Sequence, residues 1–587
     1  MNHMQKKNLL QQKSQRKVVW QIDMHKNQQL TSEQILAETY LKEIGFLNIP
    51  SKNKVLTMTK KYIVNTKPTD IIIRILDTFP LSYPKFYIKD SSLFLVYPHI
   101  EQINEEINAH DICLFEEKDK FYYENIEFLL FDNIKRLEQF IDDINSSKLN
   151  SKEIFEEFDS YWDYTRLVLN YNKELIKSHE SDFKLFDLYI SKSTQNLMII
   201  DKPTQVENFF NNSKISFDKK KILYINFKNS FPSKIPANYK EFLDVIKDTL
   251  YFDEFKKLKS DKNLFNGILF SFILPNGDEH FSFLFMKIAK HTMGKKIKIL
   301  NPIVDFLMPL RLNRKLEGGV AKDISMKRIF SRGGSEMNVS VNQKDKKIAI
   351  VGCGSIGASL AYKLLKIGCT NLVLIDPDKL NVDNISRHLL GMEYVNVNKA
   401  LALENFLLKQ FIGVNIDSHA DNVVNCYKEL KSCDLIVSAV GSDASIVETK
   451  MIKDAIIGEL PSVISCWVEA NAIAGHGILF EKDSINLKAN ITDIVDEIFG
   501  KLIILKDEYG RDLTKDDVGC NSSYMPYSFL NAEMHVNHFA NMIVQYILDK
   551  ETKPIVSSIG DLTDVKEHLK EDYKNLDSFT LYIKELF

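Results

Sequence analysis

The sequence predicts a multidomain protein with an N-terminal α+β domain, an α/β linker domain and a C-terminal α/β domain. Two observations carry this prediction. From about residue 326 onward, short apolar runs alternate with helical patterns, which is typical of a parallel sheet with helices on both faces. Near the N-terminus, short runs rich in Ile, Val, Phe and Tyr are broken by prolines, which is typical of a small antiparallel sheet. We expect the domains to span residues 1–145, 146–325 and 326–587.

The composition is that of an ordinary globular chain. Its 587 residues are 44% hydrophobic and 26% charged, and the net charge is −3. Because Lys and Arg are not in excess, we expect no nucleic-acid partner. No apolar run approaches the roughly 18 residues of a membrane span, so we expect no membrane partner. Seven cysteines without a C-x-x-C pair argue against a disulfide framework or a structural zinc site. Together these features predict a cytoplasmic protein.

The N-terminal region runs from about residue 31 to 145. One helical pattern opens it and a second, Asn125–Ile144, closes it. Between them we expect strands at Ile71–Leu76, Lys85–Ile88 and Leu93–Tyr97, with prolines between the strands. Short strands flanked by helices predict an α+β fold with an antiparallel sheet.

The middle region, from about 146 to 325, mixes helical stretches with strand-like runs such as Ile222–Phe227 and Gly267–Leu274. It contains no motif that indicates chemistry and no fixed-period repeat. We therefore interpret it as a linker or docking domain.

The C-terminal region carries the apolar runs that we expect to form parallel strands. These runs are Ile348–Val351, Leu372–Ile375, Leu435–Val440 and Val463–Trp467. Ligands of such sheets bind beyond the carboxyl ends of the strands. A glycine-rich turn follows the first run, Asp376 follows the second, and Ser442-Asp443 follows the third. The sequence therefore predicts a ligand site at this edge of the sheet.

The glycine-rich turn consists of Gly352, Gly354 and Gly357, spaced G-x-G-x-x-G before a helical pattern. Glycines let the backbone approach a phosphate, and the start of the helix offers free N–H groups. Asp376 is placed to hydrogen-bond a ribose. By itself this pattern is a weak signal, because an NAD-dependent oxidoreductase would show it too.

Further residues favour a triphosphate over a nicotinamide. Asp378, Asn384, Arg387 and Lys399 follow the second strand in that order. Asp443 follows a third strand, where a carboxylate can hold Mg²⁺ against phosphate oxygens. Two cations and a metal-binding carboxylate suit adenylate formation, in which negative charge builds on the α-phosphate and on pyrophosphate.

These motifs resemble the adenylation domain of ubiquitin-activating enzymes, which the bacterial thiamin and molybdopterin sulfur-carrier adenylyltransferases share. The resemblance implies a Rossmann-like (ThiF-type) fold that binds Mg-ATP on the glycine loop, with Asp376 on the ribose. It places Asn384, Arg387 and Lys399 near the phosphates and Asp443 on Mg²⁺. It also implies that the C-terminal carboxylate of a protein attacks the α-phosphate. Family members usually form homodimers that exchange an arginine, for which Arg328 and Arg332 are both candidates; spacing does not choose between them.

Two of the seven cysteines are candidate nucleophiles. Gly519-Cys520 precedes a helical pattern at Tyr527–Leu548, where a thiolate gains from the helix dipole. This resembles the thioester-forming cysteine of ubiquitin-activating enzymes. Five other cysteines lie in or beside apolar runs or the glycine loop, and we expect them to be structural: Cys353, Cys369, Cys426, Cys433 and Cys466.

The other candidate nucleophile is Cys113. A Pro-rich turn around Phe79-Pro80 and further strands precede the sequence Cys113-Leu114. This order resembles the ubiquitin-conjugating fold. The His-Pro-Asn motif of that family is absent in its usual form. His110 and Asn108 both lie close enough in sequence to support an oxyanion, and the sequence does not choose between them.

The two ends together predict a relay in which Cys520 captures an activated carboxylate and Cys113 then passes it to an amine, expected to be a lysine. The whole order, with Asn-Ile-Ser-Arg-His-Leu-Leu-Gly from Asn384, resembles the bacterial fusion proteins of cyclic-oligonucleotide-based antiphage signalling systems (CBASS). That resemblance implies a cGAS/DncV-like nucleotidyltransferase as the activated partner. The alternatives are a sulfur-carrier adenylyltransferase and a nucleotide-binding adaptor without conjugating activity.

Overall fold

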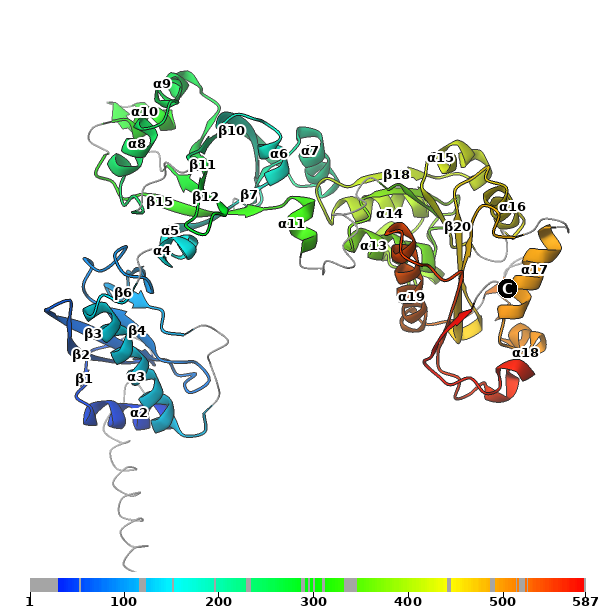
Figure 1. Ribbon diagram of the computed structural model, residues 1–587, viewed down its shortest axis with the longest axis horizontal. Helices are drawn as coiled ribbons and strands as arrows, with labels where there is room; N and C mark the ends of the chain where they lie inside the picture. The colour runs from blue at the N-terminus through cyan, green and yellow to red at the C-terminus, as the bar shows by residue number, and fades with distance from the viewer. Residues whose placement is uncertain are drawn as a thin grey trace, which may run out of the picture. The chain divides into compact units, whose positions relative to one another are not determined.

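The computed structural model separates into two compact units (Figure 1). The first consists of Met1–Leu169, Ser181–Phe186 and Lys220–Ala321, and the second of Asn170–Glu180, Asp187–Lys219 and Lys322–Phe587. The structure describes residues 30–51, 54–115, 123–149, 153–194, 197–228, 234–286, 291–293, 296–298, 301–308, 312–331, 346–440, 445–485, 491–513, 515–516, 523–524 and 526–584. The sequence-based domain boundaries at 145/146 and 325/326 stay predictions.

A six-stranded antiparallel sheet forms the N-terminal part of the first unit. Its order is β1-β2-β3-β4-β6-β5. The strands are β1 (Leu47–Asn48), β2 (Leu56–Val64), β3 (Lys67–Ile75), β4 (Lys85–Ile88), β5 (Ile100–Asn104) and β6 (Ala109–Ile112). Helices α2 (Ser32–Glu43) and α3 (Ile126–Asn145) share one core with the sheet. The predicted α+β organisation is confirmed.

One predicted strand is wrong. Leu93–Tyr97 forms consecutive turns, and the strand lies just after it, at β5. The side chain of Asp90 accepts the Ser92 amide at 2.9 Å, which starts a turn. Leu95 then takes a left-handed φ of 61°, which no strand accommodates. The aromatic and β-branched content was misleading because local hydrogen bonds outweighed strand propensity.

The middle of the chain contains a closed barrel with the strand order β10-β11-β12-β15-β7-β9-β8. The strands are β7 (Asp163–Tyr171), β8 (Phe183–Ser191), β9 (Met198–Ile200), β10 (Phe217–Asn226), β11 (Leu264–Ile273), β12 (Glu279–Phe285) and β15 (Glu317–Asp323). The accompanying helices are α4 (Glu153–Glu156), α5 (Phe158–Trp162), α6 (Lys173–Lys177), α7 (Pro203–Asn212), α8 (Tyr239–Lys247), α9 (Phe252–Lys257), α10 (Pro302–Phe306) and α11 (Met326–Phe330). The two strands expected here are confirmed as β10 and β11. Their barrel arrangement was not anticipated.

An eight-stranded sheet organises the second unit, with the order β18-β17-β16-β19-β20-β21-β24-β25. The first five strands are parallel, and the last three join antiparallel. The strands are β16 (Ile348–Val351), β17 (Asn371–Ile375), β18 (Asn415–His419), β19 (Leu435–Ser438), β20 (Val463–Val468), β21 (Ala474–Phe480), β24 (Ile555–Ile559) and β25 (Leu581–Lys584). All four predicted parallel strands are confirmed.

Helices cover both faces of this sheet, as expected for a parallel β-α-β arrangement (Figure 1). One face packs against α13 (Ser355–Lys366), α14 (Lys399–Leu408) and α19 (Phe529–Ile547). The other packs against α15 (Tyr427–Lys431), α16 (Ser445–Ile456) and α17 (Ile491–Leu502). Alternate residues of β16 face the two layers, so Ile348 and Ile350 join one core and Ala349 and Val351 the other.

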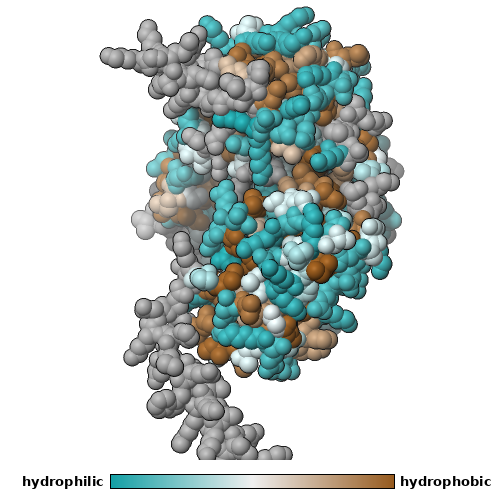
Figure 2. All heavy atoms as spheres, turned by 90° about the vertical axis from the view of Figure 1, so that its left-hand side faces the viewer, coloured by the Kyte–Doolittle hydropathy of each residue, from teal (hydrophilic) through white to brown (hydrophobic). Residues whose placement is uncertain are grey.

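The surface mixes polar and apolar residues. Figure 2 shows hydrophilic and hydrophobic residues interspersed over the visible face. Within the described part of the chain, no helix is long and apolar enough to span a membrane.

The first prediction concerns the long helix α19. Phe539 is fully buried against the sheet, whereas Leu530 on the same helix is 79% exposed. We expect Phe539→Ala to lower the free energy of unfolding of the second unit by about 3–5 kcal/mol, because it leaves a cavity. Leu530→Ala is the matched control and should change it by less than about 0.5 kcal/mol. Urea unfolding followed by hydrogen exchange of residues 529–547 measures both, and equal effects would contradict this account of the core.

Candidate functional site

The glycine loop joins β16 to α13 at the carboxyl edge of the parallel strands. Gly352 has a φ of +87°, and a Cβ there would lie 2.6 Å from the Ala439 carbonyl oxygen. A Cβ on Gly357 would lie 1.8 Å from the Gly352 carbonyl oxygen, so side chains are excluded at both positions. A Cβ on Gly354 meets nothing within 4 Å. The loop is therefore packed tightly on the sheet side and open at Gly354, where a phosphate can approach the backbone.

Asp376 ties the loops at this edge together. It follows β17, and its carboxylate accepts the Cys353 amide at 2.7 Å and the Asp378 amide at 2.8 Å. Burial raises the pKa of Asp376, while Lys399 and the two amides act in the opposite direction. A carboxylate can accept further hydrogen bonds besides these two, which suits the predicted hydrogen bond to a ribose hydroxyl.

Lys399 lies in the first turn of α14 and reaches the turn that contains Asp376 and Asp378. Its Nζ lies 3.1 Å from Asp378 Oδ2, and its side chain is largely buried. The preceding residue, Asn398, donates to the backbone oxygens of Asp376 and Asp378 at 2.8 and 3.0 Å. The structure therefore groups the glycine loop with Asp376, Asp378 and Lys399.

His388 is a residue to which the sequence assigned no role. Its Nδ1 accepts the Leu390 amide at 3.0 Å, so Nε2 carries the proton and donates to the Cys353 carbonyl at 2.9 Å. Burial lowers the pKa of His388, which keeps the ring neutral. This ring links the Asn384–Arg387 segment to the glycine loop. The sequence signal that could have identified His388 as a site residue was its position directly after Arg387.

Arg387 lines a cavity of about 640 Å³ beside the glycine loop. Its guanidinium lies 5.3 Å from the centre of the Tyr527 ring, and the Tyr527 hydroxyl lies 2.5 Å from Ser355 Oγ in α13. The other lining residues are Asp383, Ser386, Asn471, Pro526, Ser528 and Asn531. Asn384 lies one turn before Arg387, whose amide donates to the Asn384 carbonyl at 3.0 Å.

Three predicted site residues lie outside the described residues: Asp443, Cys520 and Arg332. The ends of the segment that carries Cys520 pair as a short ladder between β22 (Lys515–Asp516) and β23 (Ser523–Tyr524). Tyr527 follows Cys520 by seven residues. Arg328, the other candidate for exchange in a dimer, lies in α11.

The described cysteines divide sharply by exposure. Cys113 is exposed, whereas the five cysteines that we expected to be structural are all buried and free: Cys353, Cys369, Cys426, Cys433 and Cys466. Burial raises the pKa of Cys433 to about 11 and that of Cys369 to about 12, which disfavours the nucleophilic thiolate. The expectation that these five are structural is consistent with their burial.

Cys113 directly follows β6, which lies between β4 and β5 in the N-terminal sheet. Its amide donates to the His99 carbonyl at 2.9 Å, and its Sγ lies 3.8 Å from the Phe115 carbonyl oxygen. His99 has a left-handed φ of 64°, and its own amide donates to the Tyr161 hydroxyl at 2.7 Å. A non-glycine residue in this conformation is strained and needs such anchors. The sequence interpretation missed His99, although Pro98-His99 between two strands was a visible signal.

The two residues proposed to support an oxyanion lie apart from this arrangement. His110 is buried, with Nδ1 2.8 Å from the Glu101 carbonyl oxygen and Nε2 3.2 Å from Ser91 Oγ. It also stacks on Phe94 at 4.8 Å. Asn108 occupies the turn before β6 with a φ of 52°. Both ring nitrogens of His110 are thus engaged inside the fold, which argues against its direct use at Cys113.

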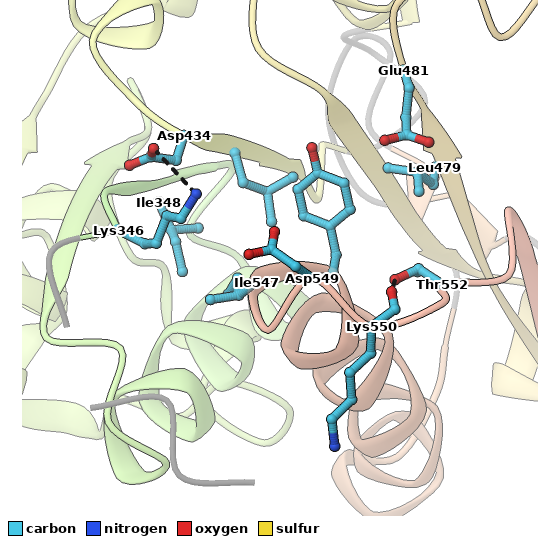
Figure 3. Close-up of a pocket in the computed structure, with 11 residues that line it drawn as sticks. Lys346, Ile348, Asp434, Leu479, Glu481, Ile547, Asp549, Lys550 and Thr552 are labelled. Carbon is cyan, nitrogen blue, oxygen red and sulfur yellow. Dashed lines mark hydrogen bonds and ion pairs between the residues drawn. The ribbon is translucent and has the colours of Figure 1, made fainter. Parts of the chain in front are cut away.

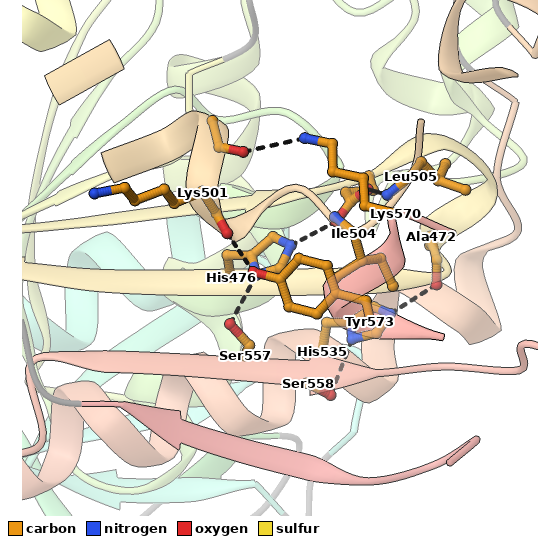
Figure 4. A network of polar contacts seen from close by, with 12 residues as sticks. Ala472, His476, Lys501, Ile504, Leu505, His535, Ser557, Ser558, Lys570 and Tyr573 are labelled. Atoms are coloured by element: carbon orange, nitrogen blue, oxygen red, sulfur yellow. Dashed lines mark hydrogen bonds and ion pairs between the residues drawn. The ribbon is translucent and has the colours of Figure 1, made fainter. Parts of the chain in front are cut away.

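A buried polar network supports the strands beside the cavity (Figure 4). The Glu469 carboxylate accepts His476 Nε2 at 2.8 Å and the amides of Ile504 and Leu505 at 2.9 and 3.2 Å. His476 Nδ1 lies 2.8 Å from Ser557 Oγ. His535 of α19 lies against Ser558 Oγ at 3.0 Å and the Ala472 carbonyl at 2.7 Å. Every polar group of this network has a partner, so it fixes the chain after α17 (Ile491–Leu502) to the sheet.

A second cavity, of about 310 Å³, lies at the opposite edge of the sheet (Figure 3). Ile348 and Leu435, which begin β16 and β19, line it together with charged residues such as Lys346 and Asp434. Ligands of parallel sheets bind at the carboxyl ends of the strands, so this cavity is not the nucleotide site.

Comparisons with known proteins agree with this geometry. The model of the ThiF family matches residues 335–478, and that of Prokaryotic E2 family B matches residues 34–168. The chain thus joins an activating-type ThiF domain, with a Rossmann-like sheet, to an N-terminal conjugating-type domain. These are the two enzyme types that the sequence predicted.

Its relatives include the ATP-dependent ubiquitin transferase-like proteins Cap2. The Pseudomonas aeruginosa protein is 31% identical over 170 residues, 27% of this chain and 30% of that protein. The Vibrio cholerae protein is 26% identical over 209 residues, 34% of each. Ubiquitin-like modifier-activating enzyme 5 of Bombyx mori is 27% identical over 143 residues, 23% of this chain and 36% of that protein. The matched segments span about a third of these relatives.

Among solved structures, E. coli MccB with ATP matches with a TM-score of 0.30 and 14% identity. The match covers 44% of this chain and 68% of that one.

The second prediction uses the buried His535. Burial lowers the pKa of His535 from 6.5 to about 4. Between these values the unfolded chain binds the proton and the folded chain does not, so stability rises as pH increases from about 4 to 6.5. The full effect is about 3 kcal/mol. We expect His535→Gln to flatten this part of the unfolding free energy against pH. Parallel profiles of the two proteins in urea titrations would contradict the assignment.

Proposed function

We propose that the chain is an ATP-dependent ubiquitin-like transferase that activates the C-terminal carboxylate of a partner protein and conjugates it to an amine. One observation carries this proposal. The same chain holds a ThiF-type nucleotide loop grouped with Asp376 and Lys399, and a conjugating-type domain with an exposed Cys113. A sulfur-carrier adenylyltransferase or a nucleotide-binding adaptor would have no use for that thiol.

The first step is adenylation. ATP lies on the glycine loop, with its ribose on Asp376 and its phosphates near Asn384, Arg387 and Lys399. The partner's carboxylate attacks the α-phosphate and pyrophosphate leaves, while the cations compensate the charge that develops. Mg²⁺ held by Asp443 would neutralise phosphate oxygens.

Two thioesters follow in this proposal. Cys520 attacks the acyl adenylate and releases AMP, Cys113 accepts the acyl group by thiol exchange, and an amine, expected to be a lysine, takes it last. Each covalent step replaces one high barrier with lower ones. Carrying both thiols on one chain raises the concentration of one near the other.

The partner follows from the resemblance to the CBASS fusion proteins and from relatives named ubiquitin transferase-like. On that basis the activated carboxylate belongs to a cGAS/DncV-like nucleotidyltransferase, and its conjugation primes antiphage signalling in the cytoplasm. The active form would be a homodimer in which Arg328 or Arg332 reaches the partner site.

The third prediction tests the nucleotide site. Lys399→Ala should lower partner-dependent exchange of pyrophosphate into ATP by about 10²-fold, because a fixed cation near the phosphates is lost. The matched control is Lys409→Ala at the end of the same helix, where Nζ contacts the Tyr394 hydroxyl at 3.0 Å. Full exchange activity in Lys399→Ala would overturn the placement of the phosphates.

The fourth prediction tests the order of the two thiols. Cys520→Ala should retain pyrophosphate exchange and form no thioester. Cys113→Ala should form the Cys520 thioester and fail to conjugate. Mass spectrometry of thiol-sensitive adducts, with and without reductant, separates these species. Cys353→Ala, which changes a buried thiol beside the glycine loop, serves as a control that should retain both thioesters. Normal conjugation by Cys113→Ala would overturn the relay.

A further inference from the structure

The pairing of β5 with β6 brings Glu101 to the Cys113 thiol. Ile100 lies opposite Ile112, and both side chains are buried in the core. The pairing becomes irregular directly after Ile100, where Glu101 begins a bulge opposite Asp111. Ile112 is buried and the next residue, Cys113, is exposed. The hydrogen bond from the Cys113 amide to the His99 carbonyl, at 2.9 Å, extends the pairing to the cysteine itself. The carboxyl and the thiol are thus diagonal neighbours across two strands.

The Glu101 carboxyl has an environment that suits a proton acceptor. Burial is the main factor that raises its pKa, and the nearby carboxylates of Asp111 and Glu157 raise it further. A hydrogen bond with the Cys113 side chain and the charge of His99 lower it. Tyr161, which lies between these groups, accepts the His99 amide and donates to Glu157 at 3.3 Å.

Other groups near Cys113 are committed elsewhere. Both ring nitrogens of His110 have partners within the fold. His99 Nδ1 lies 3.9 Å from Glu157 Oε2 and is oriented by it. Glu101 is therefore the carboxyl that the pairing of β5 with β6 places next to the thiol.

We propose that Glu101 is a catalytic residue of the conjugation step, in which it accepts the proton of the amine that attacks the Cys113 thioester. This rests on the proposed function. The amine nitrogen forms a bond to the carbonyl carbon, and the carbon–sulfur bond breaks, leaving the Cys113 thiolate. The proton lost by nitrogen moves to Glu101 and then to the thiolate, which regenerates the thiol and the carboxylate.

The same surroundings indicate which amines are accepted. Glu101, which lies beside the thiol, has the carboxyl groups of Asp111 and Glu157 near its own, so a protonated primary amine is attracted to this side of the thiol. Lysine side chains arrive in that charged form and lose one proton to water before they attack. The second proton, which nitrogen loses on attack, is the one that Glu101 accepts. A neutral nucleophile such as hydroxylamine needs neither attraction nor a strong base.

The experiment is a single-turnover discharge. The wild-type chain is loaded with its activated partner protein, ATP is then removed, and free lysine is added while the Cys113 thioester is followed on non-reducing gels. Glu101→Gln should load normally but discharge to lysine about 10²-fold more slowly. Its discharge to hydroxylamine should stay near the wild-type rate. Glu101→Asp should recover part of the lysine rate.

The matched control is Glu106→Gln in the same hairpin, where the carboxylate pairs with Arg74 at 3.2 Å and is 57% exposed. It should discharge at the wild-type rate.

Lysine discharge by Glu101→Gln at the wild-type rate would overturn the proposal. So would loss of loading in Glu101→Gln alone, because that marks a structural role. A wild-type chain that never carries a thioester on Cys113 would instead overturn the proposed function, and this inference with it.

Discussion

The nucleotide edge of the second unit depends on one buried carboxylate. Asp376 accepts amides from the glycine loop and from its own following turn, while its backbone oxygen accepts Asn398 just before α14. Burying a carboxylate costs free energy, as the raised pKa of Asp376 records, and the amides and the charge of Lys399 offset that cost. Through its side chain and its backbone oxygen, Asp376 thereby sets the relative positions of the glycine loop, the Asp378 turn and the start of α14. Lys399, which we propose to lie near the phosphates, pairs with Asp378 in the turn that Asp376 holds.

The chemistry of the thiols is governed by exposure. Buried cysteines such as Cys369 have raised pKa values because a thiolate is poorly solvated in an apolar core. Cys113 directly follows β6, where its amide donates to the His99 carbonyl and its side chain remains exposed. The same sheet that buries Ile112 therefore presents the next side chain to solvent. The exposed Cys113, our proposed nucleophile, thus directly follows the core residue Ile112 at the end of β6.

Local patterns predicted much of this fold and less of the site. The buried parallel strands β16, β17, β19 and β20 can be predicted because each is a continuous apolar run in the sequence. The glycine spacing likewise predicts the loop between β16 and α13. The antiparallel strands β21, β24 and β25 lack such a signal, since their places come from pairing: β21 with β20, β24 with β21 and β25 with β24. Glu101 and His99 escaped notice because their proximity to Cys113 arises from strand pairing across a hairpin. Asp443 and Cys520 lie outside the described residues.

The two ends of the chain present opposite electrostatic settings, and the proposed chemistry requires this difference. Adenylation creates negative charge on phosphate oxygens, which Lys399 and Arg387 can stabilise. In aminolysis of a thioester the attacking amine loses a proton, which a cationic site would disfavour and which we propose that Glu101 accepts. A single pocket cannot be strongly cationic for the first step and proton-accepting for the last. Carrying the acyl group on sulfur satisfies both requirements, because the group moves from a cationic site to a site with a proton acceptor. Neither site then has to change its charge during the reaction.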